Sequence, residues 1–125
     1  MLLDTCALLW LVQGGGKLSG ETLRELAEAP FVYVSAISGF EVGMKYIKGK
    51  LHLPVVPSDW FKAVVEHHDL QVLSLDLDIC IRSTQLPPVH NDPCDRMIIA
   101  SAQRHRLPVV TADPVFKSYD IETRC

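Results

Sequence analysis

Short apolar runs alternate along the chain with longer stretches in which apolar residues recur at helical spacing. The short runs are rich in Val, Leu, Ile and Phe and are bounded by polar, Gly or Pro residues, which is typical of buried strands. The first of them stops abruptly at Asp4. The strands predicted in this way span Met1–Leu3, Phe31–Val34, Gln71–Leu75, Leu107–Thr111 and, at an edge of the sheet, Ile121–Arg124.

The stretches between these runs carry start and stop signals for helices. Ser19 can cap a helix that Pro30 ends, and Asp92 followed by Pro93 is a cap followed by a first-turn proline. The three glycines 14–16 and Gly49 end two other helices. The predicted helices are Ala7–Gln13, Ser19–Ala29, Ser38–Lys48, Ser58–His67, Asp76–Gln85, Asp92–Arg106 and a short one after Asp113.

This alternation of strands and helices predicts an α/β fold. Parallel strands joined by helices form a sheet that is covered on both faces, which gives a three-layer α/β/α sandwich with a mainly parallel sheet of about five strands. The whole chain, residues 1–125, has the length of one domain. In such sheets the functional site lies outside the carboxyl ends of the strands.

Composition narrows the possible functions only a little. Of the chain, 48% is hydrophobic and 22% is charged, and the net charge of −3 excludes a basic nucleic-acid-binding coat. Any affinity for nucleic acid must therefore come from a local basic patch and from bound metal. No apolar run approaches the ~20 residues of a membrane span, and we expect a cytoplasmic protein. None of the 4 cysteines is spaced like a zinc or redox motif, which favours free thiols in a reducing compartment.

The placement of the acidic residues is the most informative feature. Asp4 directly follows the first predicted strand, and Asp113 lies just after the fourth. Asp95 lies in the first turn of its helix, on the face that carries Ile98, and Glu41 lies at the margin of an apolar helical face. These acids converge at one edge of a parallel sheet in the predicted topology.

Converging carboxylates repel one another and are stable mainly when they hold cations. Oxygen ligands, unaccompanied in this prediction by histidine or cysteine, select Mg²⁺ or Mn²⁺ over zinc. Each acid also has a purely structural interpretation. Asp92 and Asp113 are good helix caps, and Asp95 is an acid that the helix dipole stabilises in a first turn. Glu41 can form an ion pair with Lys45 one helical turn later.

Several stretches of the chain resemble PIN-domain proteins of the VapC-like toxin group. They are Leu2-Leu3-Asp4-Thr5-Cys6-Ala7-Leu8-Leu9-Trp10, Ser35-Ala36-Ile37-Ser38-Gly39-Phe40-Glu41, Gly49-Lys50-Leu51, the run from Leu86 to Arg96, and Val110-Thr111-Ala112-Asp113. The resemblance covers essentially the whole chain in order, and the segment from Asp92 to Asp113 is its most specific part.

The resemblance implies a metal-dependent endoribonuclease, the toxin of a toxin–antitoxin pair. It implies that Asp4, Glu41, Asp95 and Asp113 form an acidic quartet. Asp4, Asp95 and Asp113 would bind one or two Mg²⁺ or Mn²⁺ ions, while Glu41 completes the shell or holds water. It further implies RNA products with 5′-phosphate and 3′-hydroxyl ends, a homodimer, and an antitoxin segment lying across the site.

The resemblance also assigns supporting positions and shows departures. Asp92 matches a further acid near the site, and Thr5 and Thr111 match hydroxyl positions that orient carboxylates or water. End-of-strand hydroxyls are an equally good interpretation of both threonines. The chain departs from the usual pattern at Cys6, Gly39 and Cys94, where histidine, an aromatic residue and phenylalanine are commoner.

Substrate and partner surfaces are less sharply marked. Lys45, Lys48 and Arg96 are candidate RNA-phosphate contacts, although a solvated lysine face explains the lysines equally well. The helix from Ala7 to Val12 is apolar all round, as expected of a buried helix or an interface. The aromatic pair Trp60 and Phe61 favours core packing.

Three alternatives stay open on the sequence alone. A phospho-receiver domain requires a lysine after the last strand, and Lys117 is poorly placed for it. A phosphatase of the haloacid type requires a second aspartate two residues after Asp4, where Cys6 stands. A non-catalytic RNA- or protein-binding module of the same fold is the third, and an intact quartet argues against it.

Overall fold

A five-stranded parallel sheet forms the middle layer of the computed structural model, which describes residues 1–125. The strands lie in the order β3-β2-β1-β4-β5, and each neighbouring pair runs parallel. The central strand β1 is flanked by β2, which precedes helix α3, and by β4, which follows helix α6. The strands are β1 Leu2–Leu3, β2 Val32–Ser35, β3 Leu70–Leu73, β4 Val109–Val110 and β5 Thr123–Arg124.

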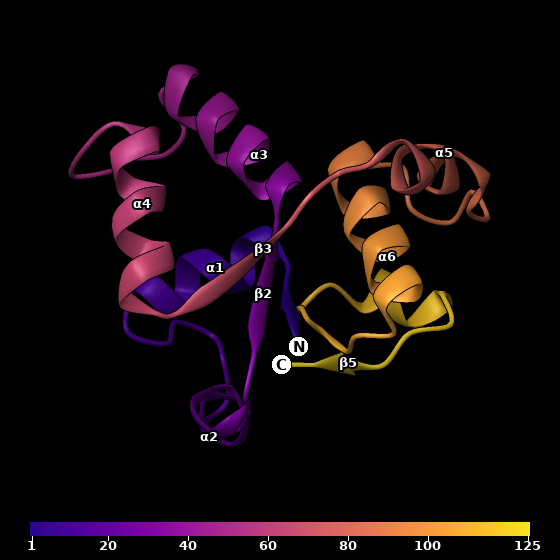
Figure 1. Ribbon diagram of the computed structural model, residues 1–125, viewed down its shortest axis with the longest axis horizontal. Coiled ribbons are helices and arrows are strands. Elements are labelled where there is room, and N and C mark those ends of the chain that lie inside the picture. Colours follow the sequence, from indigo (N-terminus) through magenta and orange to yellow (C-terminus); the bar gives the residue numbers. More distant parts are fainter.

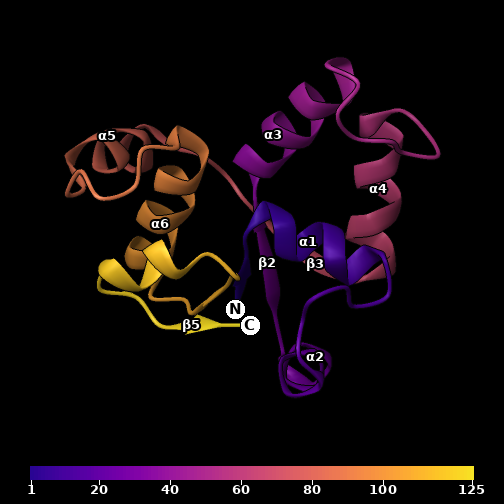
Figure 2. The same cartoon turned by 180° about the vertical axis from the view of Figure 1, so that it is seen from behind.

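Helices cover both faces of this sheet, as Figure 1 shows with the sheet seen nearly edge-on. Helices α1, α3 and α4 lie on one side with α2 beyond the end of α1, while α5 and α6 lie on the other; the reverse view in Figure 2 shows the same separation. The helices are α1 Thr5–Val12, α2 Gly20–Glu28, α3 Ala36–Ile47, α4 Pro57–His67, α5 Leu77–Gln85 and α6 Pro93–His105, with a 3₁₀ turn η1 at Pro114–Ser118.

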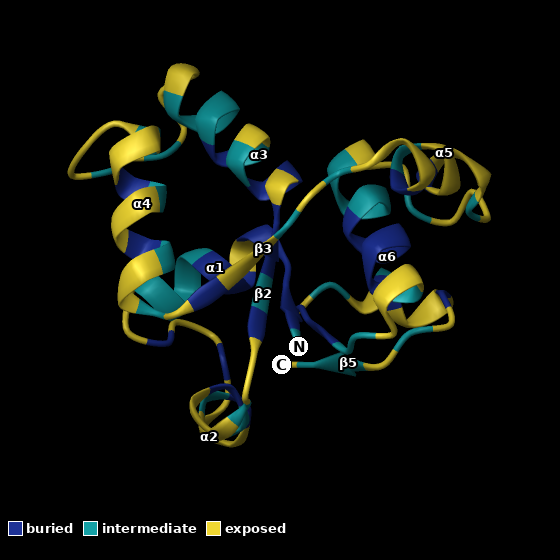
Figure 3. Cartoon of the chain, viewed as in Figure 1, coloured by how far each residue is buried: buried dark blue, intermediate teal, exposed yellow.

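Successive residues of the short central strands pack into two separate cores. Leu2 and Val109 join the core beneath α6 and η1, whereas Leu3 and Val110 join the core beneath α1, α2 and α4. This is the alternation of side chains that a strand imposes. Buried residues accordingly gather on the sheet and on the inner faces of the helices, and α5 is mostly exposed (Figure 3). The predicted three-layer α/β/α sandwich is confirmed.

Several predicted boundaries were wrong because a different residue caps the helix. Helix α3 begins at Ala36, after Ser35 accepts a hydrogen bond from the Ile37 N–H, and not at Ser38. Ser58 does not cap α4, which begins with Pro57 and has no side-chain cap. Helix α1 begins at Thr5, two residues earlier than predicted, because Asp4 is its cap.

The apolar segments singled out in the sequence lie largely in the core. Thr5, Ala7 and Leu8 of α1 are buried, and the remainder of that helix is mainly half-buried. Trp60 is buried and meets Phe61 edge to face, with 4.9 Å between ring centroids. Core packing of this pair is therefore confirmed. None of the helices combines the length and the apolar character that crossing a bilayer requires.

Substitution of glycine by alanine should have opposite effects on stability at Gly39 and at Gly16. Gly39 lies inside α3, and a Cβ added there meets no atom within 4 Å. Gly39→Ala should therefore raise the free energy of unfolding by about 0.5–1 kcal/mol, because glycine loses more backbone entropy than alanine on folding. Gly16 has a φ of +49°, and a Cβ there would lie 2.6 Å from Trp10 Cδ1. Gly16→Ala should lower the same quantity by roughly 1–2 kcal/mol. Urea unfolding of both variants measures these changes, and equal effects would contradict the packing described.

Candidate active site

The site lies at the carboxyl ends of the three central strands. Strand β1 pairs with β2 on one side and with β4 on the other. The helices that connect to these two strands lie on opposite faces of the sheet (Figure 1), so the order of strands reverses at β1. Asp4 follows β1, Thr111 follows β4, and α3 begins directly after β2. Open parallel sheets form their functional crevice at such a switch point.

Asp4 is the buried carboxylate at the centre of this edge. Its Oδ1 accepts a hydrogen bond from the Ala7 N–H at 2.8 Å, and the residue is only 6% exposed. Burial raises the pKa of Asp4, hydrogen bonds from the Thr111 side chain and the Ala7 backbone oppose that shift, and the negative charges of Glu41 and Asp113 add to it. Asp4 forms no ion pair with a basic side chain, so its negative charge is without a resident counter-charge.

Glu41 is held at the same edge by a hydroxyl pair. The Thr5 Oγ1 donates to Glu41 Oε1 at 2.7 Å and lies 2.9 Å from the Ser38 Oγ. Lys45 Nζ lies 3.7 Å from Glu41 Oε2, so the pairing considered from the sequence is present. Ser38 is fully buried, and its contact with Thr5 was not predicted. Its position three residues before Glu41 in one helix, hence on the same face, is the signal that could have indicated it.

Asp113 and Thr111 form a compact turn after β4. Thr111 Oγ1 accepts a hydrogen bond from the Asp113 N–H at 3.1 Å. Asp113 Oδ1 caps η1 by accepting from the Val115 N–H at 2.9 Å. The Oδ2 of Asp113 is thereby left to face the other acids.

Asp95 enters the site from the first turn of α6. Asp92 caps that helix, since its Oδ1 accepts from the N–H groups of Cys94 and Asp95 at 2.8 and 3.1 Å. Burial raises the pKa of Asp95 to about 7; the charges of Asp92, Glu41 and Asp4 act in the same direction, and His90 opposes them. The pKa values of Asp4 and Asp95 thus both respond to neighbouring members of the predicted quartet, which the structure brings together.

His90 belongs to this cluster although the sequence did not single it out. Its Nε2 lies 3.0 Å from Asp95 Oδ2 and 2.9 Å from Asp113 Oδ2. Ligand atoms of His90, Asp95 and Asp113 lie within 4.8 Å of one another. A histidine that the sequence did not indicate therefore lies beside the carboxylates. The residue lies in an irregular loop between α5 and α6, where no periodicity indicates the direction of a side chain.

The predicted basic residues are arranged in three different ways. Lys45 pairs with Glu41 beside the acids, and Lys48 is exposed at the end of α3. The Arg96 guanidinium donates to four backbone carbonyls, which belong to Ser83, Leu86, Pro87 and His90, at 2.7–3.0 Å. Arg96 therefore holds the loop between α5 and α6, and its contact with RNA phosphate stays a prediction.

The residues present fit a divalent cation. Asp4 is a buried carboxylate without a cationic partner, and an oxygen of Asp95 and one of Asp113 each lie within 3.0 Å of His90 Nε2, which brings these two carboxylates together. Carboxylate oxygens gathered in this way are the donors that hard cations such as Mg²⁺ and Mn²⁺ prefer. Asp4, Asp95 and Asp113 are the residues that would hold such an ion.

Comparison with known proteins gives a consistent result. The PIN domain family model matches residues 1–122. The chain is 26% identical over 120 residues to "Ribonuclease VapC22" of Mycobacterium tuberculosis, covering 95% of this chain and 91% of that protein. Among solved structures, a toxin–antitoxin complex from Klebsiella pneumoniae matches with a TM-score of 0.61 and 25% identity, covering 90% of this chain and 85% of that one. FitAcB from Neisseria gonorrhoeae matches with a TM-score of 0.70 and 19% identity, covering 99% and 96%.

The raised pKa of Asp95 predicts how the stability of the metal-free protein depends on pH. Its pKa is about 7 in the folded protein and about 4 in an unfolded chain. Between these values the folded state binds more protons than the unfolded state, so the free energy of unfolding falls as pH rises. Asp95→Asn should remove this contribution, and the variant should exceed the wild type in Tm at pH 8 in EDTA.

Thermal unfolding at pH 5 and pH 8 measures this effect, with Asp120→Asn as a control for loss of an exposed carboxylate. The wild type and the control should lose more Tm between the two pH values than Asp95→Asn does. Equal losses of Tm between pH 5 and pH 8 in all three proteins would show that the surroundings do not destabilise the ionised form of Asp95.

Proposed function

The chain belongs to the PIN domain family, and we propose that it is a divalent-metal-dependent endoribonuclease that acts in the cytoplasm as the toxin of a toxin–antitoxin pair. We further propose that residues 1–125 act as one domain. The single observation that carries the nuclease proposal is the convergence of Asp4, Glu41, Asp95 and Asp113 at the switch point of the sheet. The similarity to a ribonuclease and to a toxin–antitoxin complex supports it.

The proposed site residues divide the work of phosphodiester hydrolysis. Asp4, Asp95 and Asp113 would hold one or two Mg²⁺ or Mn²⁺ ions, which would supply a lowered pKa for the attacking water and neutralisation of charge on the leaving oxygen. Glu41 orients that water through the carboxylate that Thr5 fixes at 2.7 Å. Thr111 and Asp92 keep the turns that carry Asp113 and Asp95 in place. No covalent intermediate with a protein side chain is required.

Removal of one carboxylate tests this assignment. Asp4→Asn should lower the rate of RNA cleavage by at least about 100-fold, the usual cost of losing one group that stabilises the charge of the transition state. The amide can still accept the Ala7 N–H bond, so the fold should persist. The measurement is cleavage of labelled RNA, both structured and single-stranded, with Mg²⁺, Mn²⁺ or EDTA.

The control is Asp120→Asn, an exposed aspartate outside the cluster, which should cleave like the wild type. EDTA should abolish cleavage by both active proteins, and added Mg²⁺ or Mn²⁺ should restore it. An Asp4→Asn protein that cleaves at the wild-type rate would refute the assignment of the site.

RNA contacts are proposed at Lys45, Lys48 and Arg96, and Lys48 gives the clearest test. It is exposed at the end of the helix that carries Glu41, and it forms no ion pair in the structure. If it contacts a phosphate, Lys48→Ala should reduce the slope of log affinity against log salt by about 0.7 for single-stranded RNA. Binding is measured in Ca²⁺ at several salt concentrations, with Lys62→Ala on α4 as the control; an unchanged slope would exclude the contact.

An antitoxin and a second copy of the chain are the proposed protein partners. The similarity to the toxin–antitoxin complex from Klebsiella pneumoniae supports the first of these. A largely apolar groove of about 730 Å³ opens between α3 and α4, with Gly39, Phe61 and Val65 among its lining residues. Phe40 is 59% exposed and Ile47 is 79% exposed on α3. Exposed apolar residues of this size commonly mark protein interfaces, and we propose that one of these partners covers them.

A further inference from the structure

The loop between α5 and α6 holds His90 in one orientation. The backbone N–H of His90 donates to the Tyr119 hydroxyl at 2.8 Å, and its carbonyl accepts from Arg96 Nη1 at 3.0 Å. The imidazole packs edge to face on Phe116, with 5.7 Å between ring centroids. The side chain is only 12% exposed. Backbone and ring are thus both fixed before any ligand arrives.

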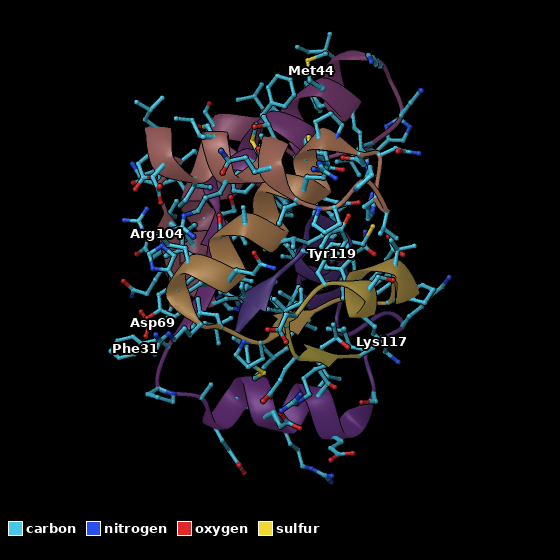
Figure 4. The ribbon with its side chains drawn as sticks, turned by 90° about the vertical axis from the view of Figure 1, so that its right-hand side faces the viewer. Phe31, Met44, Asp69, Arg104, Lys117 and Tyr119 are labelled. Carbon is cyan, nitrogen blue, oxygen red and sulfur yellow. The ribbon has the colours of Figure 1, made fainter.

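Tyr119 and Arg96 extend this support to the rest of the loop. The Tyr119 hydroxyl also donates to the Pro87 carbonyl at 2.8 Å, and Arg96 donates to the same carbonyl at 3.0 Å. Tyr119 is 5% exposed and lies inside the outline of the molecule in Figure 4, unlike Arg104 at its rim. A buried tyrosine and a charged guanidinium therefore converge on the segment that carries His90.

The hydrogen bond at the other ring nitrogen decides where the imidazole proton lies. The backbone N–H of Asp92 lies 3.1 Å from His90 Nδ1. A backbone N–H can only donate, so Nδ1 is the acceptor and the ring proton is on Nε2. That Nε2–H donates to Asp113 Oδ2 at 2.9 Å, and Asp95 Oδ2 lies 3.0 Å from the same nitrogen.

A histidine that binds a metal through Nε2 has the opposite arrangement. Its other nitrogen normally donates its N–H to a carbonyl or a carboxylate, which leaves Nε2 free of a proton. Here Nδ1 accepts, and Nε2 has a proton that it donates to the carboxylate of Asp113. The proximity of His90 to the acids therefore does not make it a ligand.

We propose that His90 is a positioning residue of the metal centre, which fixes Asp113 through its Nε2–H and holds the carboxylate of Asp95 beside it. This inference rests on the proposed function, because it assigns His90 a role toward the ion that these acids hold. Asp95 and Asp113 repel each other, and the imidazole that lies against both of them keeps an oxygen of each within 3.0 Å of its Nε2. The two carboxylates are thereby placed for a cation. The conformational entropy of their side chains is lost when the protein folds and not when the ion binds.

The first measurement concerns the metal-free protein. Long-range ¹H–¹⁵N correlation spectra of the imidazoles should show His90 with its proton on Nε2 and not on Nδ1, and the His90 signals are assigned by their absence in His90→Gln. A proton on Nδ1 would overturn the inference whatever the fate of the proposed nuclease.

The second measurement is binding of Mn²⁺, followed by calorimetry and by the Mn²⁺ electron paramagnetic resonance spectrum. His90→Leu should weaken Mn²⁺ binding about 10- to 100-fold, the usual effect of losing a residue that orients ligands. His90→Gln keeps an N–H donor near the same place and should recover most of that affinity. His52→Leu, at an exposed histidine, should bind as the wild type does.

Tyr119→Phe provides a second variant that leaves the imidazole in place. It removes the hydroxyl that fixes the His90 backbone and should weaken Mn²⁺ binding a few-fold, whereas Tyr33→Phe, at a hydroxyl without a hydrogen-bond partner, should not. The spectrum of the wild type should show no nitrogen coordinated directly to Mn²⁺.

The outcomes separate this inference from the function on which it rests. Unchanged Mn²⁺ affinity in His90→Leu, or a directly coordinated nitrogen that His90→Leu abolishes, would overturn the positioning role while leaving the metal centre intact. Absence of Mn²⁺ binding by the wild type would overturn both the metal centre and the role of His90.

Discussion

Backbone N–H groups at the starts of helices hold the carboxylates of this site in place. Asp4, Asp92 and Asp113 each accept such a bond through Oδ1, at the beginnings of α1, α6 and η1. The N-terminal end of a helix favours negative charge, which offsets part of the repulsion among the acids. Because the caps use Oδ1, the second oxygen of Asp4 and of Asp113 is left for the shared edge. The proposed metal centre and its chemistry both depend on this arrangement.

Cap and ligand are therefore compatible roles for the same residue. The sequence left both interpretations open for Asp92 and Asp113, and also left open the pairing of Glu41 with Lys45. The structure contains each of these local contacts, and the acids nevertheless converge. A carboxylate has two oxygens with several lone pairs, so one capping bond does not exhaust its capacity as an acceptor. Judging each acid separately would have missed the cluster.

Most of the fold and the acidic quartet could be predicted because strand ends and helix caps leave local signals. Asp4 and Asp113 follow apolar runs, and parallel strands place the residues that follow them at the same edge of the sheet. The position of Ser38 is indicated by its helical spacing from Glu41, whereas that of His90 leaves no such local signal. His90 reaches Asp113 through a loop whose shape depends on four carbonyls bound by Arg96 and on Tyr119, which is distant in sequence. The sequence likewise does not show that those carbonyls lie within reach of Arg96, so it indicated only the contact of Arg96 with RNA phosphate, which stays a prediction.

Two thiols beside the acids bear on which cation the site prefers. Burial, reinforced by the charges of Glu41, Asp92 and Asp95, raises the pKa of the Cys94 thiol to about 11. Burial and the charge of Asp4 likewise raise the pKa of Cys6. Soft cations bind the thiolate and not the thiol, so a soft ion would have to displace a strongly held proton from either residue. Burial first, and the charges of the acids second, thus favour the protonated form of both sulfur atoms in the metal-free protein. The departures at Cys6 and Cys94 therefore leave the carboxylates of the site in place, which is consistent with the proposed Mg²⁺ or Mn²⁺.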